Sequence, residues 1–145
     1  LLAIAHHILM FALLGLLVTE MMMLRPGIGQ AGINRLARLD ALYGTAAGLI
    51  LIVGFSRVFF GIKGPEFYLP NPVFWAKMVA FALVGLFSIV PTRRILHWRR
   101  SVRADAGFTP PASELARIKR LMHYEGTAFL TMPVFAALMA RGYGL

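Results

Sequence analysis

Four apolar stretches, each about as long as a membrane is thick, constrain this chain more than any other feature. They cover residues 1–24, 41–60, 73–90 and 121–140. A helix needs about 20 apolar residues to cross a hydrocarbon core of about 30 Å. Lipid offers no hydrogen bonds, so the backbone must satisfy its own. We therefore expect an all-α integral membrane protein, a four-transmembrane-helix bundle that forms a single membrane domain over residues 1–145.

The composition supports this expectation and excludes several kinds of chemistry. Hydrophobic residues make up 59% of the chain and charged residues 14%, against about 45–50% and 25% in soluble domains. The chain has no cysteine, which excludes disulfides, thiolate metal sites and catalytic thiols. It has no phosphate loop, nucleophile elbow or HExxH motif, so the usual support for a hydrolase or a nucleotide-driven protein is missing.

Helix breakers and caps between the apolar stretches predict where each helix begins and ends. We expect the first stretch to be a span, because it is too long for a cleavable signal peptide and has no small-residue cleavage site. The predicted boundaries are a stop at Arg25-Pro26-Gly27, a cap at Asn34, a loop over residues 61–71, a cap at Asn71 before Pro72, a third helix that runs past Pro91 to near Arg103, and a fourth helix that opens at Ser113-Glu114.

The distribution of basic residues predicts the orientation. The chain carries 15 Lys and Arg against 6 Asp and Glu. Most of the basic residues lie on the first and third connections, and only Arg57, Lys63, Lys77 and Arg141 lie toward the other side. The positive-inside rule then places both termini in the periplasm of a bacterial inner membrane, with the basic connections against anionic lipids. No nucleic-acid-binding motif accompanies the charge, so we expect no nucleic-acid partner.

Ionisable residues near the predicted outer side form the first candidate site. His6, Met10, Leu13, Leu17, Glu20 and Leu24 share one helix face, and Lys77 heads a second face with Phe81, Val84, Ser88 and Pro91. If the faces meet, His6, Met10 and Lys77 converge. This set suits a b-type haem, with His6 as axial metal ligand, Met10 or Met78 as a second ligand, and Arg57 and Lys77 pairing with propionates. The alternative is that His6 and His7 are interfacial, the basic residues extend to the headgroups and the methionines only pack.

A second group of ionisable residues lies toward the predicted inner side. It consists of Glu20, Asp40, His123 and Glu125. An ionisable group within a span costs roughly 2.5–3.5 kcal/mol on insertion scales, so each needs a partner, water or an interface. The group suits a cation site or a proton relay, but His123 and Glu125 diverge by about 200° on a helix and cannot share a ligand. The alternative is a set of structural ion pairs with Arg35, Arg38 or Arg94.

The chain resembles a bacterial family of predicted four-helix inner-membrane proteins of uncharacterised function. The residues that carry this resemblance are Ala5-His6-His7, Leu24-Arg25-Pro26, Asp40-Ala41-Leu42-Tyr43-Gly44, Arg57-Val58-Phe59-Phe60-Gly61 with Lys63-Gly64, and Asn71-Pro72-Val73-Phe74-Trp75-Ala76-Lys77.

A more distant resemblance implies a chemistry. His6 followed by Gly15, and Trp75-Ala76-Lys77 at the start of a later span, are similar to motifs of the HemJ-type protoporphyrinogen oxidases and the copper-resistance D membrane proteins. In the oxidases a histidine and a lysine in these contexts are essential, which implies roles for His6 and Lys77. The oxidase pattern also has a tryptophan between the histidine and the glycine, where this chain has Leu13 and Leu14.

These observations together predict an inner-membrane b-type haem-binding redox protein, a membrane haem oxidoreductase that transfers electrons or oxidises a lipophilic substrate. A different class is a non-catalytic accessory subunit or small transport component of a membrane complex. In that case Gly44 and Gly48, a small-xxx-small pair, would form a docking face for another subunit or a second copy of the chain. Copper handling through His6, His7 and the methionines is a third possibility.

Overall fold

The computed structural model describes residues 1–144, so Leu145 of the predicted domain lies outside the described residues. The regular structure within that range is helical, which confirms the predicted class. The helices are α1 (Leu2–Met23), α2 (Gln30–Phe60), α3 (Pro65–Tyr68), α4 (Pro72–Ala104) and α5 (Ala112–Ala140).

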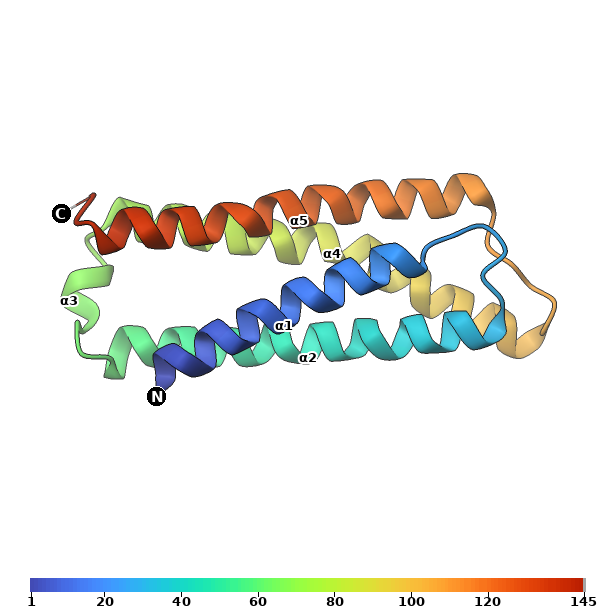
Figure 1. Ribbon diagram of the computed structural model, residues 1–145, viewed down its shortest axis with the longest axis horizontal. Helices are drawn as coiled ribbons and strands as arrows, with labels where there is room; N and C mark the ends of the chain where they lie inside the picture. The colour runs from blue at the N-terminus through green and yellow to red at the C-terminus, as the bar shows by residue number, and fades with distance from the viewer. Residues whose placement is uncertain (145) are drawn as a thin grey trace.

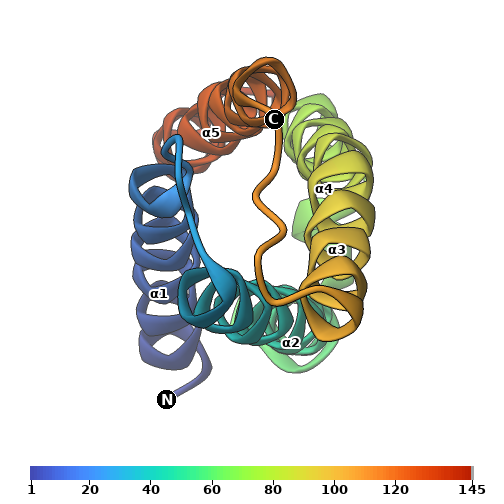
Figure 2. The ribbon, with the colours of Figure 1, turned by 90° about the vertical axis from the view of Figure 1, so that its right-hand side faces the viewer.

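The four long helices form a bundle made of two helical hairpins, α1 with α2 and α4 with α5 (Figure 1). Viewed along its length, the bundle has the order α1, α2, α4, α5 around its axis (Figure 2). α1 crosses the bundle obliquely: it starts beside α2, and its other end approaches α5 (Figure 1). Both termini and α3 lie at one end of the bundle, which we call the termini end; the connections over residues 24–29 and 105–111 lie at the other, the basic end.

Three of the long helices are long and apolar enough to cross a membrane, namely α1, α2 and α4. The chain is therefore a multi-pass membrane protein by length and composition. α5 contains the predicted fourth span but is not among these three, because polar residues such as His123, Glu125 and Thr127 interrupt its apolar sequence. α5 nevertheless packs along α4 within the bundle, and the count of four spans stays a prediction.

The core runs along the bundle axis, and large apolar side chains also cover the outside. Each long helix contributes buried residues, among them Leu17, Ile33, Trp98 and Met122. The two predicted inward faces are confirmed: Leu13, Leu17 and Glu20 are buried on α1, Leu24 is buried at its C-terminal cap, and Val84 and Pro91 are buried on α4. An apolar exterior over a packed core is the pattern expected where lipid surrounds the helices. The exposed apolar residues include Phe11, Ile52, Phe60, Leu86 and Val134.

Most of the predicted helix boundaries are confirmed. Asn71 caps α4 by accepting a hydrogen bond from the Val73 amide at 2.8 Å, and α4 continues past Pro91 to Ala104. The predicted cap at Asn34 is wrong, because α2 begins at Gln30 after Gly29. Buried Ile33, Leu36 and Ala37 extend the inward face of α2 beyond its apolar span, and their packing holds these residues in the helix. The loop predicted over residues 61–71 contains the short helix α3.

Asn71 also holds the C-terminal turn against the start of α4. Its side chain is fully buried and donates a hydrogen bond to the Tyr143 carbonyl at 3.2 Å. The next residue, Gly144, has a φ of +87°, and a Cβ there would lie 2.5 Å from the Asn71 Oδ1 atom. Only glycine fits this position without a shift of the chain. The turn thus fixes the end of α5 beside α4 at the termini end.

Candidate functional site

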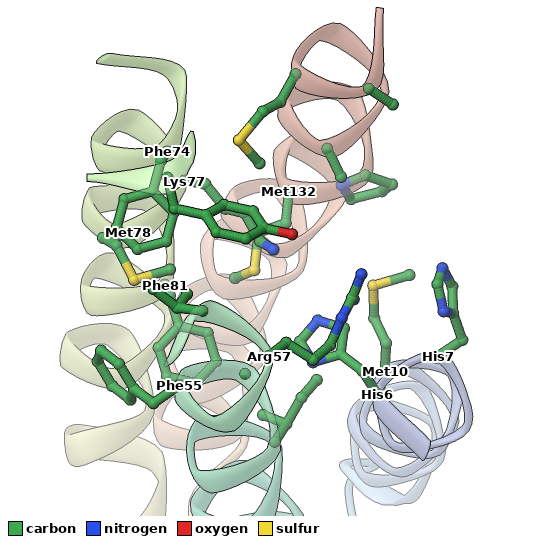
Figure 3. Close-up of a pocket in the computed structure, with 18 of the residues that line it drawn as sticks. His6, His7, Met10, Phe55, Arg57, Phe74, Lys77, Met78, Phe81 and Met132 are labelled. Atoms are coloured by element: carbon green, nitrogen blue, oxygen red, sulfur yellow. The ribbon is translucent and has the colours of Figure 1, made fainter. Parts of the chain in front are cut away.

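A cavity of about 510 Å³ lies at the termini end, between the four long helices (Figure 3). Its volume lies within the range of about 300–1,000 Å³ that is usual for ligand and cofactor sites. Exposed His7, Pro133 and Ala137 are part of its lining, so the cavity reaches the surface where α1 and α5 diverge. The structure brings together in this lining all five residues predicted for the outer site: His6, Met10, Arg57, Lys77 and Met78.

His6 is half-buried on the cavity wall, and one nitrogen of its imidazole lacks a hydrogen-bond partner within the fold. Its Nδ1 atom is buried and has no hydrogen-bond partner among the described residues. α2 passes close to the ring at Gly54, where a Cβ would lie 3.6 Å from the His6 Cε1 atom. His7 differs: it is exposed, and its Nδ1 lies 2.6 Å from the Ala3 carbonyl oxygen of its own helix. Of the two histidines, His6 is the one free to bind a ligand.

Three basic residues line the cavity, namely Arg57, Lys63 and Lys77, and none forms an ion pair with a carboxylate of the described chain. Arg57 and Lys77 are both half-buried and come from α2 and α4 (Figure 3). Within residues 1–144, the ion pair that does form joins Arg94 and Glu114, which lie 2.9 Å apart at the basic end and not at the cavity. A charge that lines an apolar cavity in a membrane needs a counter-charge or water. Arg57 and Lys77 are therefore placed to receive an anionic group of a ligand.

α5 supplies the wall of the cavity that sequence analysis missed. Phe129, Met132, Ala136 and Met139 all line it. Their spacing of three and four residues puts them on one helix face, which is the available sequence signal. That signal gave no reason to assign the face to this cavity, because its position depends on how α5 packs against α4. Aromatic side chains complete the lining, among them Phe55, Phe67, Tyr68, Phe74 and Phe81.

Three acidic residues of the predicted inner site lie together in the core, nearer the basic end. Glu20 and Glu125 are each 1% exposed and Asp40 is 7% exposed. The Tyr43 hydroxyl donates to the Glu125 Oε1 at 2.6 Å, and the Thr92 hydroxyl donates to the Asp40 Oδ1 at 2.8 Å. We call Glu20, Asp40, Tyr43, Thr92 and Glu125 the carboxyl layer. The described residues contain no group of three or more His, Cys, Asp or Glu arranged to hold a metal ion.

Two expectations about the inner site differ from the structure. His123 does not join the carboxyl layer: it is exposed, and its Nδ1 lies 2.7 Å from the Lys119 carbonyl oxygen. The reason is its two-residue separation from buried Glu125, which turns it to the opposite side of α5. The expected ion pairs with Arg35, Arg38 or Arg94 are also wrong for the carboxyl layer within residues 1–144. Arg35 and Arg38 are exposed, and Arg94 pairs with Glu114 instead.

The predicted docking face is present on the outside of α2. Gly44 and Gly48 are both exposed, and a Cβ at either position would meet nothing within 4 Å. No other helix of the described chain occupies this face. Its use as a subunit contact stays a prediction.

Residues 1–144 match a family described as "Predicted membrane protein (DUF2214)". No curated protein and no solved structure gave a significant match.

Proposed function

Because the chain belongs to the DUF2214 family of predicted membrane proteins, whose description names no reaction, we propose a function from the cavity itself: the protein binds b-type haem within the membrane as a redox cofactor. The observation that carries this proposal is His6, a half-buried imidazole with an unpartnered Nδ1 on the wall of a 510 Å³ cavity. Imidazole is the usual axial ligand of b-type haem iron, and the bound iron supplies one-electron chemistry.

The charges and the shape of the lining fit the same group. A haem has an apolar ring and two carboxylates, and the cavity combines aromatic and thioether side chains with the Arg57 and Lys77 charges. These two residues would pair with the propionates, since no carboxylate of the described chain pairs with them. The surface opening between α1 and α5 would admit a lipophilic electron donor or substrate from the bilayer.

A second side chain that would hold the haem would come from a helix other than that of His6. Met10 follows His6 by four residues, so both side chains lie on the same face of α1 and approach a ligand from the same side. Met78 on α4 and Met132 on α5 face the cavity from other helices (Figure 3). We therefore favour Met78 or Met132 over Met10 for this role. A thioether ligand raises the reduction potential of a haem relative to histidine ligation.

The first test is the reduced-minus-oxidised absorption spectrum of the detergent-purified protein, with a pyridine haemochrome assay and metal analysis on the same sample. We expect nearly one b-type haem per chain, lost in His6→Ala and retained in His7→Ala, the matched exposed histidine. A colourless and metal-free protein from haem-replete cells would overturn the proposal. It would favour an accessory subunit or a small transport component.

A potentiometric titration tests the second ligand. We expect Met78→Leu or Met132→Leu to lower the potential and change the spectrum, because the iron loses its thioether. Met10→Leu should leave both unchanged. A change in Met10→Leu alone would contradict the assignment to a helix other than that of His6.

The proposed location is a bacterial inner membrane, with the termini end in the periplasm. Its support is the charge distribution: 11 of the 15 Lys and Arg residues lie toward the basic end. A cytoplasmic basic end would meet the anionic inner leaflet.

A further inference from the structure

The carboxyl layer contains three acidic groups and no basic group that neutralises them. Three carboxyls from three helices are more than nine-tenths buried in one part of the core. The charged or titratable groups that act on Glu20 across the helix interfaces are Asp40 on α2 and Glu125 on α5, with the Tyr43 phenol beside Glu125. Within residues 1–144 none of the three carboxyls forms an ion pair with Lys, Arg or His. The layer therefore has no fixed positive charge to balance it.

Hydrogen-bond donors satisfy two of the carboxyls but not the third. Tyr43 donates to Glu125, and Thr92 donates to Asp40. Glu20 is 1% exposed, and its Oε1 is buried with no hydrogen-bond partner among the described residues. A buried carboxylate oxygen without a donor is strongly unfavourable in a membrane core. Glu20 is thus the group in the layer that most needs a bound cation.

A proton is the cation that the arrangement fits. Ionisation of all three groups would place three like charges in a medium of low dielectric constant, so at least one carboxyl holds a proton. A metal ion would need several ligands around one point, and the described residues form no such group. A protonated Glu20 is neutral and gains an O–H donor to bond within the layer.

We propose that the carboxyl layer is an intramembrane proton-binding site in which Glu20 holds the exchangeable proton. Binding converts the carboxylate and a hydronium ion into a carboxylic acid and water, and release is the reverse step. Because the three carboxyls interact, the proton affinity belongs to the layer as a unit, and Asp40 and Glu125 set it through their charges.

The proton exchanges through the basic end of the bundle. Glu20 lies three residues before the end of α1 at Met23, a rise of only about 4.5 Å. Asp40 and Glu125 lie much farther inside their helices, 10 and 13 residues from the starts of α2 and α5. The short α1 therefore brings Glu20 close to the connection over residues 24–29, in which Arg25, Pro26 and Gly27 are exposed.

The proton site is separate from the cavity at the termini end. Glu20 follows His6 by fourteen positions along α1, a rise of about 21 Å. Leu13 and Leu17, each 1% exposed, fill the interval on the same face. The proton site therefore stands whether or not the cavity holds haem.

Infrared difference spectroscopy of the full chain in lipid, across a pH titration, tests the proposal. The chain has only 6 Asp and Glu residues, so a carboxylic-acid C=O band in this protein is assignable. We expect a pH-dependent band that shifts in D₂O and loses the equivalent of one group in Glu20→Gln. Gln is neutral and nearly the same size as the protonated side chain, so this variant should fold. Glu66→Gln, in an exposed position on α3, is the matched control and should keep the band.

Two outcomes would overturn the proposal. The first is a well-folded Glu20→Gln variant, judged by circular dichroism and gel filtration, whose band matches the parent's. The second comes from repeating the titration in sodium and in choline. The band should titrate at the same pH in both, whereas a sodium-dependent displacement would assign the layer to a metal cation instead.

Discussion

Gly54 determines how closely α2 approaches the His6 ring. A Cβ at this position would lie 3.6 Å from Cε1 and 3.8 Å from Nδ1 of the imidazole. These are ordinary van der Waals distances, so a methyl group fits but a longer side chain has to enter the volume of the ring. Gly54, which also lines the cavity, thus limits the position of the proposed haem ligand.

We predict that Gly54→Ala retains haem and that Gly54→Leu lowers haem occupancy several-fold, because the leucine displaces His6. The pyridine haemochrome assay measures the occupancy. Gly85→Leu is the control, since Gly85 is exposed and a Cβ there meets nothing within 4 Å. Equal loss of haem in the Gly85 and Gly54 leucine variants would contradict a local effect on His6.

The Tyr43 to Glu125 hydrogen bond joins the two hairpins across the core. Both residues are buried, and their oxygens lie 2.6 Å apart. Removal of the hydroxyl leaves a buried carboxyl without its donor, which costs roughly 1–3 kcal/mol. We therefore predict that Tyr43→Phe lowers the free energy of unfolding in detergent by about this amount. Tyr124→Phe, on the exposed side of α5, should change it little; similar losses in both variants would argue against the bond.

At the residue scale, the ionisable groups that need a partner can be identified from the sequence, but their partners cannot always be. Helical spacing was enough to place His6, Met10 and Lys77 on inward faces. The partners of Asp40 and Glu125 turned out to be hydroxyl groups and not arginines. Thr92 and Tyr43 carry no charge. The local sequence does not distinguish a hydroxyl that donates a hydrogen bond across the core from one that donates to a carbonyl of its own helix.

At the scale of single elements, α4 and α5 are joined at the basic end through Glu114. Its Oε2 accepts a hydrogen bond from the Trp98 indole at 2.9 Å, and its Oε1 lies 2.9 Å from the Arg94 Nε. Trp98 is fully buried, whereas the Arg94 side chain is 43% exposed. The indole bond is therefore the contact whose loss leaves a buried group unsatisfied.

We predict a graded loss of thermal stability at Glu114. Glu114→Ala leaves the buried indole N–H of Trp98 without an acceptor and should lower the free energy of unfolding by roughly 1–3 kcal/mol. Glu114→Gln keeps an acceptor for Trp98 and loses only the partly exposed ion pair, which is worth about 0–1 kcal/mol. Thermal unfolding in detergent measures both, with Glu66→Ala as the exposed control. Equal losses for the Ala and Gln variants would show that the charge, and not the indole bond, matters.

Element boundaries were predictable where a local cap defines them and less so where packing does. Asn71 and Pro72 mark the start of α4 from chemistry within three residues. The start of α2 was misplaced because Asn34 is a good cap by residue type, yet buried Ile33 and Leu36 hold the preceding turn in the helix. Tertiary packing outweighed a local preference there.

At the scale of the whole molecule, the path of α5 decides the topology. If α1, α2 and α4 cross the membrane and α5 runs beside α4, then residues 106 and 143 lie on opposite sides. The chain has no cysteine, so a single introduced thiol reports its own location. Ala106 and Tyr143 are both exposed.

We predict that Tyr143→Cys reacts with a membrane-impermeant maleimide in intact bacteria and that Ala106→Cys reacts only after the membrane is opened. The positive charge of the basic end should hold residue 106 in the cytoplasm. Labelling of both thiols from one side would show that α5 does not cross. The reverse pattern would keep four spans and invert the proposed orientation.

The division of the bundle into two hairpins has a consequence for how the protein is made. Packing is densest within each hairpin, but each site draws on both: His6 and Arg57 come from the first hairpin and Lys77 and Met132 from the second. The two hairpins would be synthesised one after the other, and both sites would form only when the hairpins pack against each other in the membrane. Two separate genes divided within residues 61–71 should therefore complement each other, and neither half alone should bind a ligand.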